Sequence, residues 1–263
     1  MSNTVYSKQD AIDALAFMSG AIDSGVFQIH GQSDEHTWLQ FVFGEHCKAV
    51  KNYIESDDKQ CETDAPDNVQ FVTQSVEYVG GYGGADTIES AARTCTDTDS
   101  NNTDGFVRSL VSRGHMSPTE FGFADFRIVV DRGIQQELTR HRHLSFNIES
   151  TRWIDYGKHE FSYIVDPVDG WDVPEVAVER LKRLCYESAR CYEDLLALGA
   201  PRDYARKALL LCTASKMRVA GNFRAWVEMI GKRIGKRVHP EFRSLAMSFK
   251  EKLSEIVPPL LDE

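Results

Sequence analysis

The sequence predicts an α+β fold in which a mixed sheet is accompanied by several long helices. Segments rich in β-branched and aromatic residues, a composition typical of strands, occupy 69–79, 124–131 and 159–165. Helical patterns, with apolar residues every three or four positions, stand before, between and after them in no regular alternation. Because a strict strand–helix alternation would favour a parallel α/β sheet, the mixed order favours α+β.

The first 68 residues are predicted to form a small, acidic helical extension. Ser7 and Ser33 are each placed to cap a helix that carries apolar residues at helical spacing. Residues 1–80 hold four lysines and no arginine against thirteen acidic residues, a formal charge of −9. The polar, acidic and proline-containing stretch 55–68 is typical of a linker, so we expect a separate domain over 69–263.

Local signals place the helices of this second domain. Asp86 and Glu89 have the spacing of a capping box, and Pro174 suits the start of a long helix. The glycine-rich stretch 80–84 matches no dinucleotide or phosphate-loop fingerprint and is predicted to be a flexible turn. The expected helices cover 86–95, 103–114, 133–142, 174–199, 201–212, 222–234 and 240–256.

Charge is distributed unevenly along the chain. The formal net charge of −10 argues against general binding to nucleic acid. Residues 202–243, however, hold eleven Lys and Arg against three acidic residues, a charge of +8. A small anionic ligand is therefore expected to bind in the second half, where the local field matters more than the net charge.

Membrane, secretion and metal signals are not found in the sequence. No apolar run approaches the roughly 18–20 residues that cross a membrane, and the N-terminal residues lack a basic start followed by an apolar block. Six cysteines occur without a CxxC pair, and His141 and His143 have poor spacing for joint metal ligation. We expect a cytoplasmic protein with reduced thiols and no metal.

The most informative motif is RHRHLSFNIESTRW, from Arg140 to Trp153. Arginine offers a rigid fork of donors that matches phosphate and carboxylate oxygens in pairs. A cluster of arginines at the end of a predicted helix therefore suits a ligand that carries several phosphates. Taken alone, the Arg140–Arg142 triplet also fits a solvated basic surface or a short nucleic-acid patch.

The complete pattern, RHR followed after seven residues by Ser150, resembles the signature of the flavin-dependent thymidylate synthases. The resemblance covers about residues 69–245 and rests on four blocks in the family's order. These blocks are Ala91–Cys95, Gly114–Glu120, Arg140–Trp153, and the succession of Pro201–Arg206, Asn222–Arg224 and Arg233.

The resemblance implies a homotetramer of α+β subunits whose active sites are shared between chains. It implies FAD as cofactor and dUMP as substrate, with a methylene group from methylenetetrahydrofolate and with NADPH to reduce the flavin. The implied FAD-binding residues are Arg140, His141, Arg142 and Asn222, with Cys95 near them as a small buried wall residue. The implied nucleotide-binding residues are Glu137, Arg140, Glu149, Ser150, Thr151, Arg152, Arg206 and Arg233, of which Arg233 would stabilise negative charge on the pyrimidine.

The chain departs from the family pattern near the base and the flavin. Phe121 stands where a histidine is usual, Glu137 where a glutamine is common, and Glu228 where an asparagine is often found. Ile148 replaces a usual glutamate, with Glu149 one place later. The structural alternatives are that Phe121 simply packs and that Glu137 pairs with Arg140 one helical turn on.

The prediction is a methyltransferase that converts dUMP to dTMP, with folate and a pyrimidine deoxynucleotide monophosphate as partners. Two alternatives remain open. An ionised Glu137 can only accept hydrogen bonds, so a related enzyme that methylates or hydroxymethylates dCMP also fits. The departures at Phe121 and Ile148 also fit a non-catalytic homologue that binds flavin and nucleotide.

Overall fold

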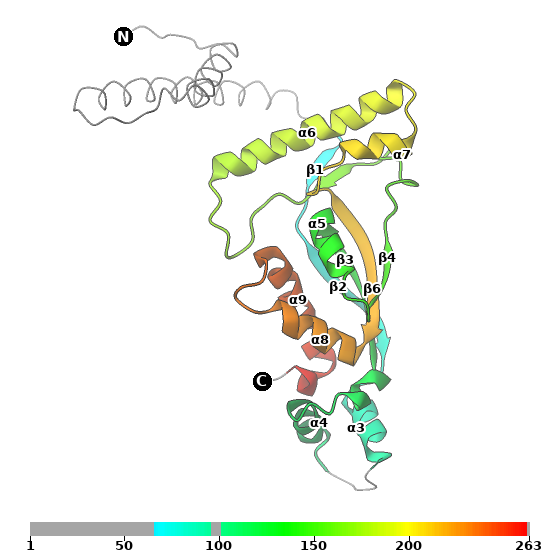
Figure 1. Ribbon diagram of the computed structural model, residues 1–263, viewed down its shortest axis with the longest axis vertical. Helices are drawn as coiled ribbons and strands as arrows, with labels where there is room; N and C mark the ends of the chain where they lie inside the picture. The colour runs from blue at the N-terminus through cyan, green and yellow to red at the C-terminus, as the bar shows by residue number, and fades with distance from the viewer. Residues whose placement is uncertain (1–65, 96–100, 262–263) are drawn as a thin grey trace, which may run out of the picture. The chain divides into compact units, whose positions relative to one another are not determined.

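A computed structural model describes residues 66–95 and 101–261 of this protein. The predicted extension over residues 1–68 therefore lies, apart from its last three residues, outside the described ones. The α+β prediction is confirmed by a four-stranded antiparallel sheet in the order β2-β3-β6-β4 and a parallel pair, β1-β5 (Figure 1). Parallel and antiparallel pairings thus fall in two sheets rather than in one mixed sheet. The strands are β1 (Val69–Phe71), β2 (Ser75–Tyr82), β3 (Phe123–Asp131), β4 (Ser145–Ile148), β5 (Phe161–Tyr163) and β6 (Ala214–Asn222).

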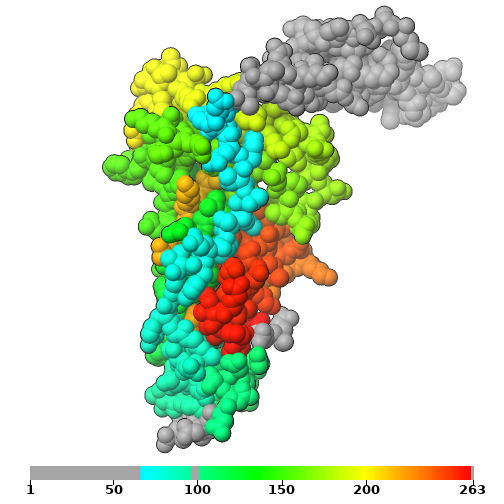
Figure 2. Space-filling view, turned by 180° about the vertical axis from the view of Figure 1, so that it is seen from behind, coloured from blue at the N-terminus to red at the C-terminus, as the bar shows by residue number. Residues whose placement is uncertain are grey.

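Three helices, α5, α8 and α9, pack on one face of the four-stranded sheet (Figure 1). From the opposite side, Figure 2 shows the C-terminal residues (red) beside β2 (cyan). The longest helix, α6, instead covers the β1-β5 pair together with α7. The helices are α3 (Ala85–Arg93), α4 (Thr103–Ser112), α5 (Arg132–Leu138), α6 (Glu175–Ala197), α7 (Arg202–Ala205), α8 (Phe223–Arg233) and α9 (Pro240–Ile256), and the 3-10 turns are η2 (Ser117–Phe121), η3 (Arg206–Ala208) and η4 (Pro258–Leu260).

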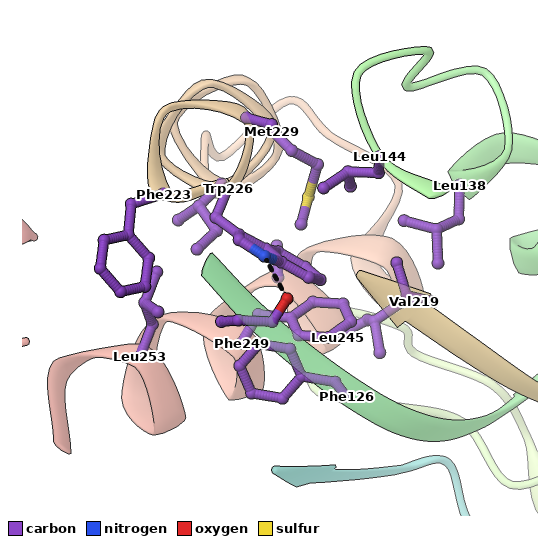
Figure 3. Close-up of a cluster of buried hydrophobic side chains, with 14 of the residues drawn as sticks. Phe126, Leu138, Leu144, Val219, Phe223, Trp226, Met229, Leu245, Phe249 and Leu253 are labelled. Atoms are coloured by element: carbon purple, nitrogen blue, oxygen red, sulfur yellow. Dashed lines mark hydrogen bonds between the residues drawn. The ribbon is translucent and has the colours of Figure 1, made fainter. Parts of the chain in front are cut away.

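The main core lies between the antiparallel sheet and these three helices. Alternate side chains of β3 and β6, such as Phe126 and Val219, are fully buried on this face, as the period of two in a strand requires. Figure 3 shows Trp226 of α8 at the centre, where its ring lies 4.9 Å from that of Phe126 and 4.8 Å from that of Phe249 (centroid distances). A second cluster, around Tyr163 and Tyr192, packs α6 onto the small sheet.

The sequence prediction was wrong about the first strands of the domain and about β6. The expected strand over 69–79 is divided into β1 and β2, which belong to different sheets. Gly80 and Gly81, predicted to lie in a turn, belong to β2, and the turn comes at Gly83, whose φ is +79°. The central strand β6 was missed, although Ser215–Val219 alternates buried and exposed side chains.

Several helix ends also differ from the prediction. Gly84, not Asp86, is the N-cap of α3, and its amide donates to Thr87 Oγ1 at 3.3 Å. The segment 201–212 forms only the short helix α7 and a 3-10 turn. Most relevant to the site, α5 ends at Leu138, so the arginine triplet follows the helix instead of belonging to it.

Candidate active site

The arginine triplet is held in a tight corner between α5 and β4. The carboxylate of Asp131 caps α5 by accepting from the Ile134 amide at 2.6 Å. After the helix, the His141 amide donates to the Leu138 carbonyl at 3.0 Å, and the Leu144 amide donates to that of His141 at 3.1 Å. These turns bring Arg140 and Arg142 to the surface on either side of the half-buried His141.

Arg140 and Arg142 keep their guanidinium donors free. Within residues 66–95 and 101–261, neither side chain makes a hydrogen bond or an ion pair. Arg218 and Arg224, in contrast, pair with carboxylates at 2.6 Å. Two exposed arginines without protein acceptors form a donor set suited to an anionic ligand with several oxygens.

Arg233, the last residue of α8, lies at the centre of the contacts beside this corner. Its Nε donates to Nε2 of His141 at 3.1 Å, and its Nη1 donates to Oε2 of Glu137 at 3.2 Å. Its guanidinium carbon also lies 4.3 Å from the ring centroid of Phe242. Glu137 therefore pairs with Arg233 and not with Arg140, so the expected pair one helical turn apart is wrong.

His141 is a neutral acceptor in this arrangement. Burial, the positive charge of Arg233 and that of Lys232 lower the pKa of His141 below its ordinary value, the burial effect being the largest. Because Nε2 accepts from Arg233, the remaining proton belongs on Nδ1. The middle residue of the triplet thus contributes hydrogen bonding rather than a third positive charge.

A second group of predicted site residues lies where α7 and η3 meet the segment after β4. Arg206 Nη1 donates to Thr151 Oγ1 at 3.3 Å, and Thr151 is buried. Arg152 is exposed and pairs with Asp203 at 3.2 Å. Ser150 lies between these contacts, and its Oγ accepts from the Arg152 amide at 3.4 Å.

Glu149 supports this second group from inside the fold. Its Oε1 accepts a hydrogen bond from the Tyr156 hydroxyl at 3.1 Å. Burial, followed by the charge of Glu149 and this hydrogen bond, raises the pKa of Tyr156 far above its ordinary value. Tyr156 therefore remains a neutral donor that fixes the Glu149 carboxylate.

The remaining predicted residues lie toward the end of the sheet where β4 begins after the arginine triplet. Asn222 caps α8, since its Oδ1 accepts from the Ala225 amide at 2.9 Å. Phe121 is 64% exposed, so the expectation that it simply packs is wrong. Cys95 is also exposed, which contradicts the expectation of a small buried wall residue. Glu228 pairs with Arg224 on its own helix at 3.0 Å.

The strand β4 separates the two arginine groups within one chain. Arg142 precedes β4 and Ser150 follows it, with Ser145 paired to Ala220 and Ile148 to Met217. At roughly 3.4 Å per residue, such a strand spans about 10 Å or more. In the described part of the chain, no side chain is bonded to both Arg206 and Arg233, since Arg206 contacts Thr151 whereas Arg233 contacts His141 and Glu137.

A cavity of about 990 Å³ adjoins the second group and was not predicted from the sequence. Glu149 and Tyr156 form part of its wall, and Lys158, His159 and Lys216 add basic groups. These three residues come from two distant segments and form no sequence motif, so only their juxtaposition in the fold identifies the cavity.

The structure also bears on the negative predictions. No helix of the described residues is long and apolar enough to cross a membrane. Among the same residues, no cluster of three or more His, Cys, Asp or Glu side chains could hold a metal ion. The cysteines at 95, 185, 191 and 212 have free thiols, and the sulfurs of Cys185 and Cys212 lie 3.6 Å apart.

Comparison with known proteins places this arrangement in a family. The family described as "Thymidylate synthase complementing protein" matches residues 78–259. The chain is 31% identical over 196 residues to a flavin-dependent thymidylate synthase of Corynebacterium diphtheriae, which covers 67% of this chain and 77% of that protein. It is 28% identical over 202 residues to one of Mycobacteroides abscessus, which covers 69% and 80% respectively. The chain therefore belongs to the thymidylate synthase complementing protein family, as the four motifs that resemble flavin-dependent thymidylate synthases predicted.

Proposed function

We propose that this protein is a flavin-dependent thymidylate synthase, a methyltransferase that converts dUMP to dTMP. Its co-substrates are methylenetetrahydrofolate and NADPH, and its cofactor is FAD. Family membership and the names of the relatives support the reaction class. The observation that carries the proposal to this chain is that Arg140 and Arg142, which have no side-chain partner among the described residues, flank His141, to which the guanidinium of Arg233 is bonded.

The donor set at the corner fits the phosphates of FAD. Arg140 and Arg142 would hold the diphosphate, since each has a whole fork of donors available. His141 would hold Arg233 in place by accepting its hydrogen bond at Nε2. Asn222, at the start of α8, would lie near the flavin. When bound, FAD supplies the hydride that completes the methyl group, while the protein orients the reactants.

The nucleotide would be held by residues with distinct tasks. Arg206, Arg152 and the polar backbone around Ser150 would bind its phosphate. Arg233 would face the pyrimidine and stabilise the negative charge that develops on the ring before C5 bonds to the methylene group. Glu137 lies beside Arg233 and would accept a hydrogen bond from the base.

We propose a homotetramer with shared active sites, and this division of tasks supports the sharing of a site between copies. Arg206 and Arg233 belong to groups that β4 separates in one chain. A single nucleotide can meet both if one copy of the chain provides the phosphate site and another provides the base site. At dUMP concentrations far below the KM of Arg206→Ala, mixed tetramers of Arg206→Ala and Arg233→Ala subunits should therefore be more active than either variant alone. No recovery after refolding the two together would contradict the shared site.

The reaction itself is tested by incubating the purified protein with dUMP, methylenetetrahydrofolate, FAD and NADPH. The expected product is dTMP, identified by its mass. A parallel reaction with dCMP separates the alternatives, because methyl- or hydroxymethyl-dCMP would identify a cytosine enzyme. Tight binding of FAD and dUMP without any product would identify a non-catalytic homologue.

A further inference from the structure

The side chain of Glu137 is held between a guanidinium group and an imidazole ring from different parts of the chain. Its Oε2 accepts from Arg233 Nη1 at 3.2 Å, and its Oε1 lies 3.2 Å from Nδ1 of His239. Arg233 ends α8, whereas His239 immediately precedes α9. The Glu137 carboxylate thus connects α5 to the C-terminal end of α8 and to the loop before α9.

His239 is itself fixed by its surroundings. Pro240 follows His239 and begins α9, and the carbonyl of His239 accepts from the Arg243 amide at 2.9 Å. Its ring lies 5.3 Å from that of Trp171 (centroid distance) at an angle of 51°. A histidine with a fixed backbone and a packed ring can hold the Glu137 carboxylate at a defined position.

Arg233 is constrained on three sides by these neighbours. His141 accepts from its Nε, Glu137 accepts from its Nη1, and the Phe242 ring lies against its guanidinium. Its Nη2 has no hydrogen-bond partner among the described residues. These contacts therefore fix the guanidinium of Arg233 and leave its Nη2 to donate to a ligand.

We propose that His239 is a positioning residue for Arg233 and that it acts through Glu137. This inference rests on the proposed function insofar as Arg233 stabilises charge on the pyrimidine. A flexible arginine would have to be ordered during each turnover, which costs side-chain entropy, whereas a group fixed in advance does not. His239 itself would touch neither the nucleotide nor the flavin.

The kinetic test compares His239→Ala with His239→Asn. The alanine removes the contact to Glu137, so kcat should fall on the order of 10-fold while KM for dUMP changes little, because misplaced groups lose transition-state stabilisation first. The asparagine keeps a donor near the position of Nδ1 and should restore most of kcat. Lys236→Ala removes an exposed basic side chain of the same loop outside this network and is the matched control, expected to retain full activity.

A second measurement does not depend on the enzymatic activity. Phenylglyoxal modifies accessible guanidinium groups, and peptide masses report each arginine separately. Arg233 should react severalfold faster in His239→Ala than in the wild type or in His239→Asn. Arg142, which has no side-chain partner in the described part of the chain, should react equally fast in all three and serves as the internal control.

The two measurements separate the outcomes. If the wild type makes no dTMP, the proposed function fails, while the modification rates of Arg233 still test the positioning. Equal rates at Arg233 in all three proteins would overturn the positioning role, and so would a kcat of His239→Ala equal to that of the wild type. Loss of activity in both His239 variants with unchanged Arg233 reactivity would also overturn it, because the histidine would then act by another route.

Discussion

The indole of Trp226 donates through Nε1 to the carbonyl oxygen of Ala124 at 3.2 Å, and it also reaches that of Gly221 at 3.1 Å. Ala124 and Gly221 face each other across β3 and β6, so one buried side chain ties α8 to both central strands. Because α8 carries Arg233 at its other end, this contact also fixes the helix that presents the predicted catalytic residue.

Trp226→Phe should lower the free energy of unfolding by about 1–3 kcal/mol. The substitution keeps a large aromatic ring but removes a buried donor from its acceptors. Urea unfolding followed by circular dichroism measures the change. Trp153→Phe is the matched control, since Trp153 is 82% exposed and its substitution should change stability by roughly 0.5 kcal/mol or less. Equal effects of the two substitutions would contradict the role given to the indole.

The sequence predicted the elements whose pattern is local and missed those that depend on pairing. α6, α8 and α9 were placed to within a few residues, because amphipathic periodicity and proline starts are local signals. β6 was missed because Ala214–Asn222 contains lysine, arginine and glycine, which disfavour a strand when taken alone. Its position between β3 and β4 makes it a strand.

The candidate site shows the same division. The arginine cluster was recognisable because its residues are close in sequence. Glu137 has two partners, Arg233 and His239, which lie about a hundred residues away in the sequence. Helical spacing suggested only Arg140 as its partner. Contacts of this kind arise where α5, α8 and the loop before α9 meet, which no local pattern describes.

Two glycine substitutions should change stability in opposite directions. A Cβ on Gly122 would lie 2.0 Å from Cε2 of the buried Phe223, so Gly122→Ala should cost about 1–3 kcal/mol through overpacking. A Cβ on Gly231, inside α8, meets nothing within 4 Å. Gly231→Ala should therefore stabilise the protein by about 0.5–1 kcal/mol, because alanine is the better helix former. Thermal unfolding of both variants beside the wild type checks the two signs.

Glu241 should make the protein less stable as the pH rises through neutrality. Burial, and then the negative charges of Asp131 and Glu137, raise the pKa of Glu241 from 4.5 to about 7. The folded state therefore binds its proton more tightly than the unfolded state does. The contribution of Glu241 to the free energy of unfolding is greatest below pH 4.5 and falls between the unfolded-state and folded-state pKa values. It is constant above the folded-state pKa, and its total change is at most roughly 3 kcal/mol.

Glu241→Gln isolates this effect because the amide cannot ionise. Relative to the wild type, the variant should gain more stability at pH 8 than at pH 5, measured by urea unfolding at both values. Glu251→Gln, at an exposed position of the same helix, should differ from the wild type in stability by the same amount at pH 5 and at pH 8. A gain for Glu241→Gln that is independent of pH would show that the carboxyl is not protonated in the folded state.

Arg142→Ala should weaken the retention of flavin more than it weakens folding. Arg140 and Arg142 are proposed to hold the FAD diphosphate, and the substitution removes one of these two guanidinium groups. No side-chain contact within the described structure is lost. The ratio of flavin absorbance to protein after gel filtration gives the retention, and the melting temperature gives the stability. Arg113→Ala, at another exposed arginine, should retain flavin like the wild type. A wild-type protein that is colourless and does not respond to added FAD would remove the basis of the proposed function.

Arg206→Ala and Arg233→Ala should both impair the use of dUMP, but in different kinetic constants. Arg206 is proposed to bind the phosphate equally in the ground state and the transition state, so its loss should raise KM and leave kcat nearly unchanged. Arg233 is proposed to act on charge that exists only once the ring is attacked, so its loss should lower kcat even at saturating dUMP. Removing one such donor typically costs on the order of 100- to 1000-fold in kcat. Steady-state kinetics with dUMP, at saturating folate and NADPH, separates the two effects. Full turnover by Arg233→Ala would remove that residue from the chemistry and leave its contacts with Glu137 and His141 as purely structural.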